Sequence, residues 1–431
     1  MTLRAADAAL IATNEFVFST NSIRITPEFL TDLSEELRTN NSAVHAVRWR
    51  ANAAAANART VRTWDDPMGK IGGMGARTEM RADDGDLIYG VEQKLPLFGK
   101  PKAARQLADA EAATESAKVE VQFQTLRRDL AKTVFRASLA DRAVTLGYED
   151  IAWLDTLVDS VESRYRNGTA SLTELIQTQN ERARRRNQLR TEESLVHHEH
   201  VGINRLLNRK SSFHWDRFDL PEVASPVPFT ARLLDLASKY EPKLRVMERE
   251  LKMADASVDA ARRARMPDFS VGAQGRTYSR NGDFRSAEVM LSFNIPWGNR
   301  DKYDAEIKRE QAKKVAAEYD IDSELKGLVQ EVHQLTFMID NARREALLYR
   351  DELIPRSRTA LEAAHTAWLS GKGMLRDVIE SRRMLTEAQL MYARAVSEQY
   401  QAMSELVLCC GIGDFEALQM IGVKEEGKKQ P

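Results

Sequence analysis

The sequence contains the same pattern twice, about two hundred residues apart. The segments PMGKIGGMG, from Pro67, and PDFSVGAQG, from Pro267, share a proline, a β-branched residue and two glycines at a step of 200. Further on, YRNGTASLTELI from Tyr165 matches WLSGKGMLRDVI from Trp368 at a step of 203. An internal repeat constrains the architecture more than any local pattern, because each copy must fold into the same unit. We therefore expect two copies of one structural unit.

Each copy shows the same order of expected elements. A leading amphipathic helix is followed by two strands, a very long helix, a turn with glycine and a returning helix. The first repeat covers residues 1–220, the second covers residues 221–415, and residues 416–431 form a polar C-terminal tail. The expected fold class is mainly α with a small β part.

Apolar and polar residues alternate in the strand candidates, as in a strand with one apolar face. The first hairpin spans about 70–96 and the second about 268–296, where Val289, Leu291 and Phe293 alternate with polar residues. Strands of about ten residues can cross a bilayer when tilted. Four strands are too few to close a membrane barrel, which needs about eight, so several chains would have to pool their strands. This predicts an obligate oligomer.

The strongest periodicity lies in two long helical hairpins, at about 100–208 and about 301–410. Apolar residues recur there at steps of four and three, which is the heptad pattern of a coiled coil. In the second copy this pattern consists of Ile321, Leu325, Leu328, Val332, Leu335, Ile339, Ala342, Ala346, Tyr349 and Leu353. The equivalent pattern in the first copy is interrupted at Thr133 and Gly147. Pro355 is expected to kink the second long helix.

Charge and cysteine content exclude several classes of protein. The 63 basic and 64 acidic residues nearly cancel, so no net field would recruit nucleic acid. Cys409 and Cys410 are the only cysteines, and neighbours on a helix point apart, so we expect packing residues. No apolar run of about 18 residues offers a spanning helix. The first residues do not form a secretory signal, and we expect that any export signal has been removed or was never there.

Three further features are weaker candidates for binding. The HHEH segment at 197–200 lacks further ligands, so a polar helix face is favoured over a metal site. The basic run ERARRRNQLR from Glu181 has no interleaved aromatic residues, which argues against nucleic acid. Met68, Met74 and Met80 are scattered, as gap-filling methionines are. Catalytic, phosphate-binding and metalloprotease motifs are absent, so we expect neither an enzyme nor a cofactor nor a bound metal.

Three features carry a resemblance to a known family: the segment VEQKLPLFGKPKAARQLADAEAA from Val91, the Tyr/Trp-x-x-Gly turns followed by TELI and RDVI, and the duplicated layout. Over roughly residues 27–410 they resemble the TolC-type outer-membrane efflux proteins, with the heavy-metal efflux branch as one option. The resemblance implies a homotrimer with a twelve-stranded barrel in the outer-membrane lipid and an α-helical tunnel across the periplasm. It also implies passive export of substrates from an inner-membrane pump and a periplasmic adaptor.

Two other classes of protein stay open. The strand hairpins could cap the helices of a soluble coiled-coil scaffold protein as a small sheet. A periplasmic adaptor is the third option, although an adaptor would normally show one helical hairpin flanked by β-rich domains instead of a whole-chain duplication. The paired strand hairpins at a step of 200 favour the channel.

The resemblance implies a pore constriction near the two glycine turns. Asp377 and Glu380 lie three residues apart on one helix face and match the family's acidic ring. In a trimer they would bring six carboxylates together, which favours cation binding. Glu174 matches Asp377 in the first copy, whereas Gln177 replaces Glu380. The competing interpretation is a pair of ordinary solvated acids.

The turns are also the expected contacts for the adaptor, at Gly168, Thr169, Gly371 and Lys372. Glycine there has a second explanation, because a helix end often requires a left-handed backbone.

The chain departs from the family at the latch of the closed state. Gly373 stands where the family has a latching arginine, and Trp368 stands where it has a latching tyrosine. Lys372 or Arg376 could substitute.

Two prolines and two aromatic residues occupy matching places where each second strand ends: Pro96, Phe98, Pro296 and Trp297. The resemblance makes these positions the joint between barrel and tunnel, at the membrane interface where aromatic rings are favoured. Ordinary packing at a strand end is the alternative.

Overall fold

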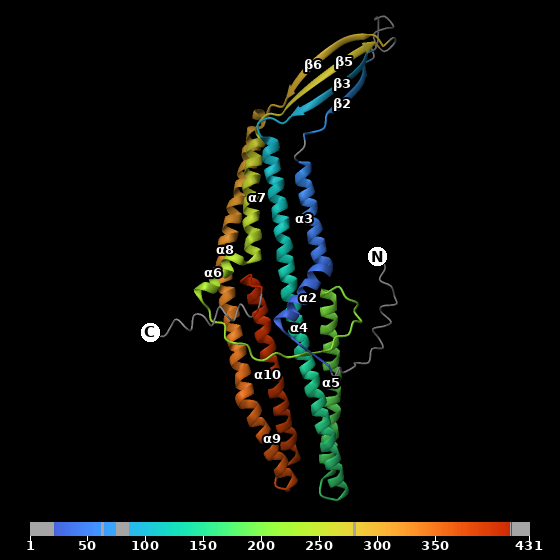
Figure 1. Cartoon of the computed structure of the whole chain (residues 1–431), viewed down its shortest axis with the longest axis vertical. Coiled ribbons are helices and arrows are strands. Elements are labelled where there is room, and N and C mark those ends of the chain that lie inside the picture. Colours follow the sequence, from blue (N-terminus) through green and yellow to red (C-terminus); the bar gives the residue numbers. More distant parts are fainter. Residues whose placement is uncertain (1–20, 62–63, 75–85, 279–281, 414, 416–431) are drawn as a thin grey trace, which may run out of the picture. The chain divides into compact units, whose positions relative to one another are not determined.

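The structure, a computed structural model, describes residues 21–61, 64–74, 86–278, 282–413 and 415 (Figure 1). Long helices dominate it, and the strands form one small pair and one sheet of four. The predicted fold class, mainly α with a small β part, is confirmed.

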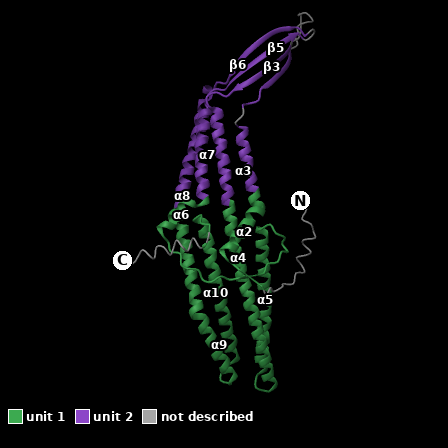
Figure 2. Cartoon of the chain, viewed as in Figure 1, with its two compact units in different colours: residues 1–45, 122–242, 326–431 green, residues 46–121, 243–325 purple. Residues whose placement is uncertain are grey.

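Two compact units make up the chain (Figure 2). Unit 1 consists of residues 1–45, 122–242 and 326–431, and unit 2 consists of residues 46–121 and 243–325. These units do not coincide with the two sequence repeats, because each unit takes segments from both. The repeat boundaries at 220 and 415 stay a prediction.

Both predicted helical hairpins are present. In the first copy α4 (Lys100–Arg166) is followed by α5 (Leu172–Leu206). In the second copy α8 (Arg300–Leu348) and α9 (Ile354–Leu369) lead to α10 (Leu375–Cys409).

Instead of a simple proline kink, a π-helical turn, η2 (Tyr349–Leu353), separates α8 from α9. The N–H of Ile354 donates to the carbonyl of Tyr349, five residues earlier. Pro355 follows at once and has no N–H to donate, so the regular hydrogen-bond pattern of an α-helix could not continue through it. The proline therefore marks an irregular turn, as a π-bulge often does.

Each repeat begins with two helices. The first copy has α2 (Pro27–Asn40) and α3 (Ser42–Thr60), and the second has α6 (Ala231–Tyr240) and α7 (Pro242–Ala264). In the second copy the break falls at Glu241, directly before a proline, where the helical conformation is disfavoured.

At the break between α2 and α3, the side chain of Asn41 satisfies the free backbone groups. Its Oδ1 accepts from the N–H of Ala43 at 2.8 Å, and its Nδ2 donates to the carbonyl of Leu206 on α5 at 2.7 Å. Capping of this kind replaces the bonds that a helix start lacks.

Four strands form one antiparallel sheet in the order β2-β3-β5-β6. Their bounds are β2 (Met68–Met74), β3 (Asp86–Leu95), β5 (Phe269–Tyr278) and β6 (Phe284–Phe293). The two predicted hairpins join through β3 and β5, so one sheet combines both repeats. Within the described residues, β2 and β6 are each paired on one side only.

A short parallel pair that the sequence did not predict lies in unit 1. It consists of β1 (Ser22–Arg24) and β4 (Arg217–Asp219). Three-residue strands carry too little alternation to be recognised from sequence.

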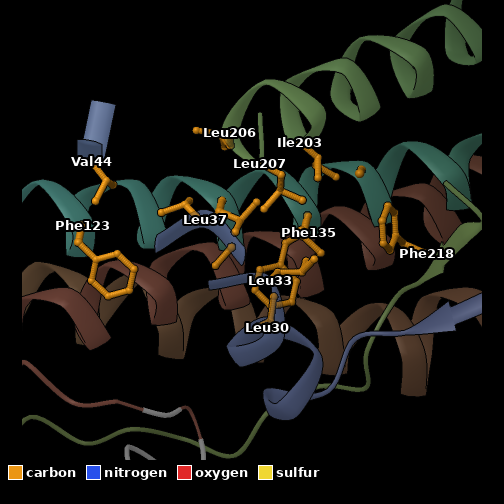
Figure 3. Close-up of a cluster of buried hydrophobic side chains, with 14 residues drawn as sticks. Leu30, Leu33, Leu37, Val44, Phe123, Phe135, Ile203, Leu206, Leu207 and Phe218 are labelled. Carbon is orange, nitrogen blue, oxygen red and sulfur yellow. The ribbon is translucent and has the colours of Figure 1, made fainter. Parts of the chain in front are cut away.

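The core of unit 1 lies where α2, α4, α5 and β4 meet (Figure 3). Leu37, Phe135, Ile203 and Phe218 have at most 1% of their surface exposed. Fully burying an apolar side chain of this size contributes about 1.5–3 kcal/mol. This core fixes the α4–α5 hairpin, which carries the candidate site residues Gly168, Thr169 and Glu174.

Candidate functional site

The turns of the two helical hairpins have the same backbone conformation. Gly168 has φ +74° and Gly371 has φ +73°. The N–H of Thr169 donates to the carbonyl of Arg164 at 2.8 Å, and the N–H of Lys372 donates to the carbonyl of Ala367 at 2.9 Å. These bonds close a left-handed helix end of the Schellman type. A Cβ on either glycine would meet no atom within 4 Å, so only the backbone conformation requires glycine there.

Asp377 and Glu380 are exposed in the first turns of α10. Asp377 lies in the first turn, where the helix dipole favours a negative charge. Glu380 lies 3.8 Å from Arg383 with 63% of its side chain exposed, so the charge of this ion pair is largely solvated. Both acids of the predicted constriction are therefore accessible to ions on this helix.

Glu174 has a structural partner of its own. Its carboxylate accepts the N–H of Ser171 at 2.9 Å, while its own N–H donates to the Ser171 Oγ at 3.2 Å. This reciprocal capping box holds the start of α5. Glu174 thus begins a helix, as Asp377 does in the second copy, but its carboxylate is already engaged.

Trp368, the residue at the latching tyrosine's place, is buried within its own chain with 3% exposure. It packs in a cluster with Leu157 and Val161 of α4 and with Leu375 and Val378 of α10. The guanidinium of Arg164 lies 4.6 Å from the centre of the Trp368 ring. The indole therefore joins the two turn ends of one protomer through packing and a cation–π contact.

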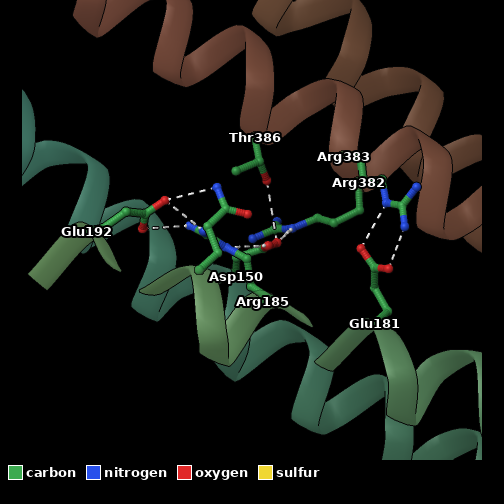
Figure 4. A network of polar contacts seen from close by, with 8 residues as sticks. Asp150, Glu181, Arg185, Glu192, Arg382, Arg383 and Thr386 are labelled. Carbon is green, nitrogen blue, oxygen red and sulfur yellow. Dashed lines mark hydrogen bonds and ion pairs between the residues drawn. The ribbon is translucent and has the colours of Figure 1, made fainter. Parts of the chain in front are cut away.

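A second connection between the hairpins lies around Asp150, which is 8% exposed (Figure 4). Its carboxylate accepts from Arg382 Nε of α10 at 2.6 Å and lies 3.2 Å from Arg185 Nε of α5. Arg185 also donates to Glu192 at 2.8 Å, and Thr386 of α10 donates to Asp150 at 3.4 Å. We call these five residues the Asp150 cluster. It connects α4, α5 and α10 through one buried carboxylate.

A further ion pair links α5 to α10 near the Asp150 cluster. Arg383 donates two hydrogen bonds to Glu181, one of them from Nε at 2.8 Å. The hydrogen bonds from Arg383 lower the pKa of Glu181 below its ordinary value of 4.5. The segment of α10 that follows the exposed acids is thus held on both helices of the first hairpin.

Sequence reasoning missed the Asp150 cluster, although one signal was present. The heptad pattern of the first copy is interrupted at Gly147, about one turn before Asp150. A Cβ on Gly147 would lie 2.9 Å from both Arg185 Nη2 and Glu192 Oε2. The glycine leaves space on α4 for these charged side chains.

The strand-to-helix joints lie at the predicted residues. Between the end of β3 and the start of α4, Phe98 and Gly99 both have positive φ, 57° and 71°. Two successive residues with positive φ make a sharp local bend, and Arg263 Nη1 stabilises it by donating to the carbonyl of Phe98 at 3.2 Å. In the second copy Pro296 begins a 3₁₀ turn, η1 (Pro296–Asn299).

The two aromatic residues at these joints are exposed, Phe98 at 44% and Trp297 at 62%. Pro96 lies in the same joint as Phe98, directly after the last residue of β3. A membrane interface at these residues stays a prediction.

The four-stranded sheet has one apolar and one polar face. The register places on one face Ile71, Leu87, Tyr89, Val91, Val271, Ala273, Val289, Leu291 and Phe293. Most of the large side chains among them are exposed, Val289 at 82%. The opposite face carries two ion pairs, Lys70 with Glu92 and Arg276 with Glu288. An apolar sheet face that the described residues leave exposed indicates a contact with lipid or with another protein.

The weaker sequence candidates have ordinary structural roles. His200 lies edge-on to Phe218, with ring centres 5.6 Å apart, and its Nε2 is 3.8 Å from Asp141. Over the described ranges, no group of three or more potential metal ligands is found. In the basic run, Arg182 and Arg186 pair with Asp155 of α4.

Cys409 and Cys410 are buried free thiols, and burial raises the pKa of Cys410 to about 12. Met80 and the side chain of Met74 lie outside the described residues. In the part of the chain that the structure describes, no helix combines the length and apolar character needed to cross a membrane.

Two segments of the chain match the model of a known protein family. Residues 33–209 and 233–411 match the family model described as outer membrane efflux protein. No curated protein sequence matches the chain.

Solved structures share the fold at low sequence identity. The outer-membrane channel OprN superposes with a TM-score of 0.77 at 16% identity, covering 90% of this chain and 91% of that one. VceC from Vibrio cholerae gives a TM-score of 0.74 at 15% identity, covering 89% and 96%. CusC gives a TM-score of 0.74 at 14% identity, covering 93% and 95%.

Proposed function

The chain belongs to the outer membrane efflux protein family, and on this premise we propose that it is the exit duct of a tripartite efflux or secretion system. It would passively export substrates that an inner-membrane pump delivers through a periplasmic adaptor. The duct needs no catalytic group and no cofactor, because the pump supplies the energy.

The sheet carries this proposal. Its apolar face is exposed, its other face is polar, and both edge strands have an unpaired side within the described residues. An open sheet edge is not tolerated in lipid, so the edges must meet strands of other chains. Three copies would pool twelve strands into one closed barrel with its apolar face toward the outer-membrane lipid. Phe98 and Trp297 would then lie at the periplasmic interface.

The helical hairpins would form the periplasmic tunnel of the trimer. Three copies of Asp377 and Glu380 would gather six carboxylates at the constriction, where divalent cations bind and block. Glu174 would add three more acids nearby, although its capping role limits its freedom. The turns at Gly168, Thr169, Gly371 and Lys372 would contact the adaptor.

Single-channel conductance in a planar bilayer tests the proposal. The purified protein should give discrete cation-selective openings that divalent cations block from the helical side. The double variant Asp377→Asn, Glu380→Gln should relieve this block, because it removes all six carboxylates. Glu398→Gln, at an exposed position five turns further along α10, is the matched control and should leave the block unchanged.

The outcomes test the channel and the assignment of its gate separately. Conductance whose divalent block survives the double variant would keep the channel and reject these acids as its gate. A protein that never inserts and remains a soluble rod would favour the coiled-coil scaffold.

A further inference from the structure

A belt of polar contacts crosses the polar face of the sheet in unit 2. Lys70 of β2 forms an ion pair with Glu92 of β3. Ser292 of β6 donates to the other carboxylate oxygen of Glu92 at 3.1 Å. We call Lys70, Glu92 and Ser292 the Glu92 belt, because it spans the sheet from one edge strand to the other.

The belt passes over β5 at a glycine. The register places Gly272 of β5 between Glu92 and Met290 of β6. Because Gly272 has no side chain, the Glu92 carboxylate can reach past its neighbouring strand to Ser292. The contact therefore depends on the sequence of three strands and fixes the position of the carboxylate.

The other carboxylate on this part of the face is also paired. Glu288 accepts from Gln274 Nε2 at 2.9 Å and lies 3.3 Å from Arg276 Nη2. Lys94, near the end of β3, lies 3.7 Å from Asp65 and 3.9 Å from Asp268. Among the described residues, each of these charges thus has an opposite charge nearby on the face that would line the water-filled passage.

From this arrangement we infer that Lys70 sets the ion selectivity of the strand-lined passage by neutralising Glu92. The inference rests on the proposed function, since only a closed barrel turns the polar face into a pore wall. In a trimer the Glu92 belt would occur three times around the wall. Each Glu92 that loses its lysine would present a fixed negative charge to passing ions, and fixed charges in a pore wall select counter-ions.

Three variants test the inference through the reversal potential of open channels in a salt gradient. Lys70→Met keeps the length of the side chain and removes its charge, so cation selectivity should rise. Glu92→Gln keeps a group that can bond Ser292 and leaves Lys70 unpaired, so selectivity should move toward anions. The double variant should return to the wild-type value. One unit charge about 10 Å away in water changes the local ion concentration about twofold, which sets the expected size of each change.

The opposite shifts of ion selectivity in the two single variants distinguish an electrostatic effect from structural damage to the sheet. A structural disturbance of the sheet would move both single variants the same way, and the double variant further. That result, or unchanged selectivity in all three, would overturn the inference while leaving a conducting channel. No conductance from the wild-type protein would overturn the proposed function and this inference together.

A second measurement checks which face meets water, even if a charge variant fails to insert. Ser292→Cys and Val289→Cys place thiols on opposite faces of β6. In membrane-inserted protein, a charged thiol reagent should label the first variant and not the second. The native Cys409 and Cys410 are 4% and 0% exposed, so they add little background. Labelling of Val289→Cys alone would place the polar face away from the pore and overturn the inference.

Discussion

Asp150 shows how one buried charge can hold three helices. Its carboxylate faces Arg185 and Arg382, which are both largely buried beside it. Removing one member of such a group leaves the others desolvated and incompletely paired. Because Arg382 lies two residues after Glu380, the cluster also positions the exposed acids at the start of α10.

Asp150→Asn should therefore destabilise the protein by about 1–3 kcal/mol, the cost of a buried charged hydrogen bond. Asp155→Asn is the matched control on the same helix, since Asp155 also faces two arginines but has 40% of its side chain exposed. That variant should cost less than about 1 kcal/mol. Thermal unfolding at one scan rate and hydrogen exchange of α10 measure both effects. Equal losses in the two variants would contradict a special role for Asp150.

The Glu181–Arg383 pair predicts a pH dependence. The pKa of Glu181 is lowered in the folded chain by hydrogen bonds from Arg383, so the unfolded chain binds the proton more readily. The pair therefore stabilises the fold above the ordinary value of 4.5, and this contribution is lost as pH falls through the lowered pKa.

Arg383→Gln should be less stable than the wild type at neutral pH, and the difference should shrink below pH 4.5. Denaturant unfolding of both proteins across this range measures the difference. Arg376→Gln, at an exposed arginine of the same helix, should give a smaller difference. A difference in unfolding free energy between wild type and Arg383→Gln that stays constant down to strong acid would show that Glu181 is not the titrating partner.

Individual ion pairs were the least predictable part of the site. A charged residue in an amphipathic helix is normally on the solvated face, and sequence does not reveal which face another helix will cover. Asp150, Arg185 and Arg382 therefore gave no sign of their contact. Gly147 was informative because a missing side chain in a heptad position requires a reason, here the close approach of Arg185 and Glu192.

At the scale of elements, the long helices and the ten-residue strands β3, β5 and β6 were predictable because each repeats a strong pattern over its length. The turns at Gly168 and Gly371 were also predictable, since glycine at a helix end has a specific backbone reason. The short strands β1 and β4, the break at Asn41 and the π-turn before Pro355 were not. Each depends on contacts between distant segments or on hydrogen bonds within one turn.

Substitutions at Gly168 and Gly371 test whether the left-handed backbone conformation explains these glycines. Gly168→Ala and Gly371→Ala should each cost about 1–2 kcal/mol, because an alanine in the left-handed region is strained. Asparagine, which tolerates this conformation, should cost less at the same positions. Hydrogen exchange at the turn and thermal unfolding measure the loss.

Gly327→Ala supplies a control of opposite sign. Gly327 is exposed inside α8 and has space for a Cβ, so alanine there should stabilise the helix by up to about 1 kcal/mol. If alanine is equally harmless at Gly371, then the left-handed turn does not explain that glycine.

At the scale of the whole molecule, the described part of one chain leaves the edges of its sheet unpaired and the apolar face exposed. In the described residues β2 and β6 keep one unpaired side each, and the apolar face has nothing packed over its centre that would bury Val289. The number of strands in the sequence already predicted an oligomer. It could not give the stoichiometry, which came from the family resemblance.

We expect the detergent-solubilised protein to have three times the 48.7 kDa mass of one chain by native mass spectrometry.

Val289→Arg should lower membrane insertion, because a charge facing lipid near the bilayer centre costs about 2–4 kcal/mol. Met290→Arg is the control at the same depth on the polar face and should insert normally. Flotation of vesicles after refolding into lipid measures insertion. Equal insertion of both variants would mean that this face does not meet lipid, and the twelve-stranded barrel would have to be abandoned.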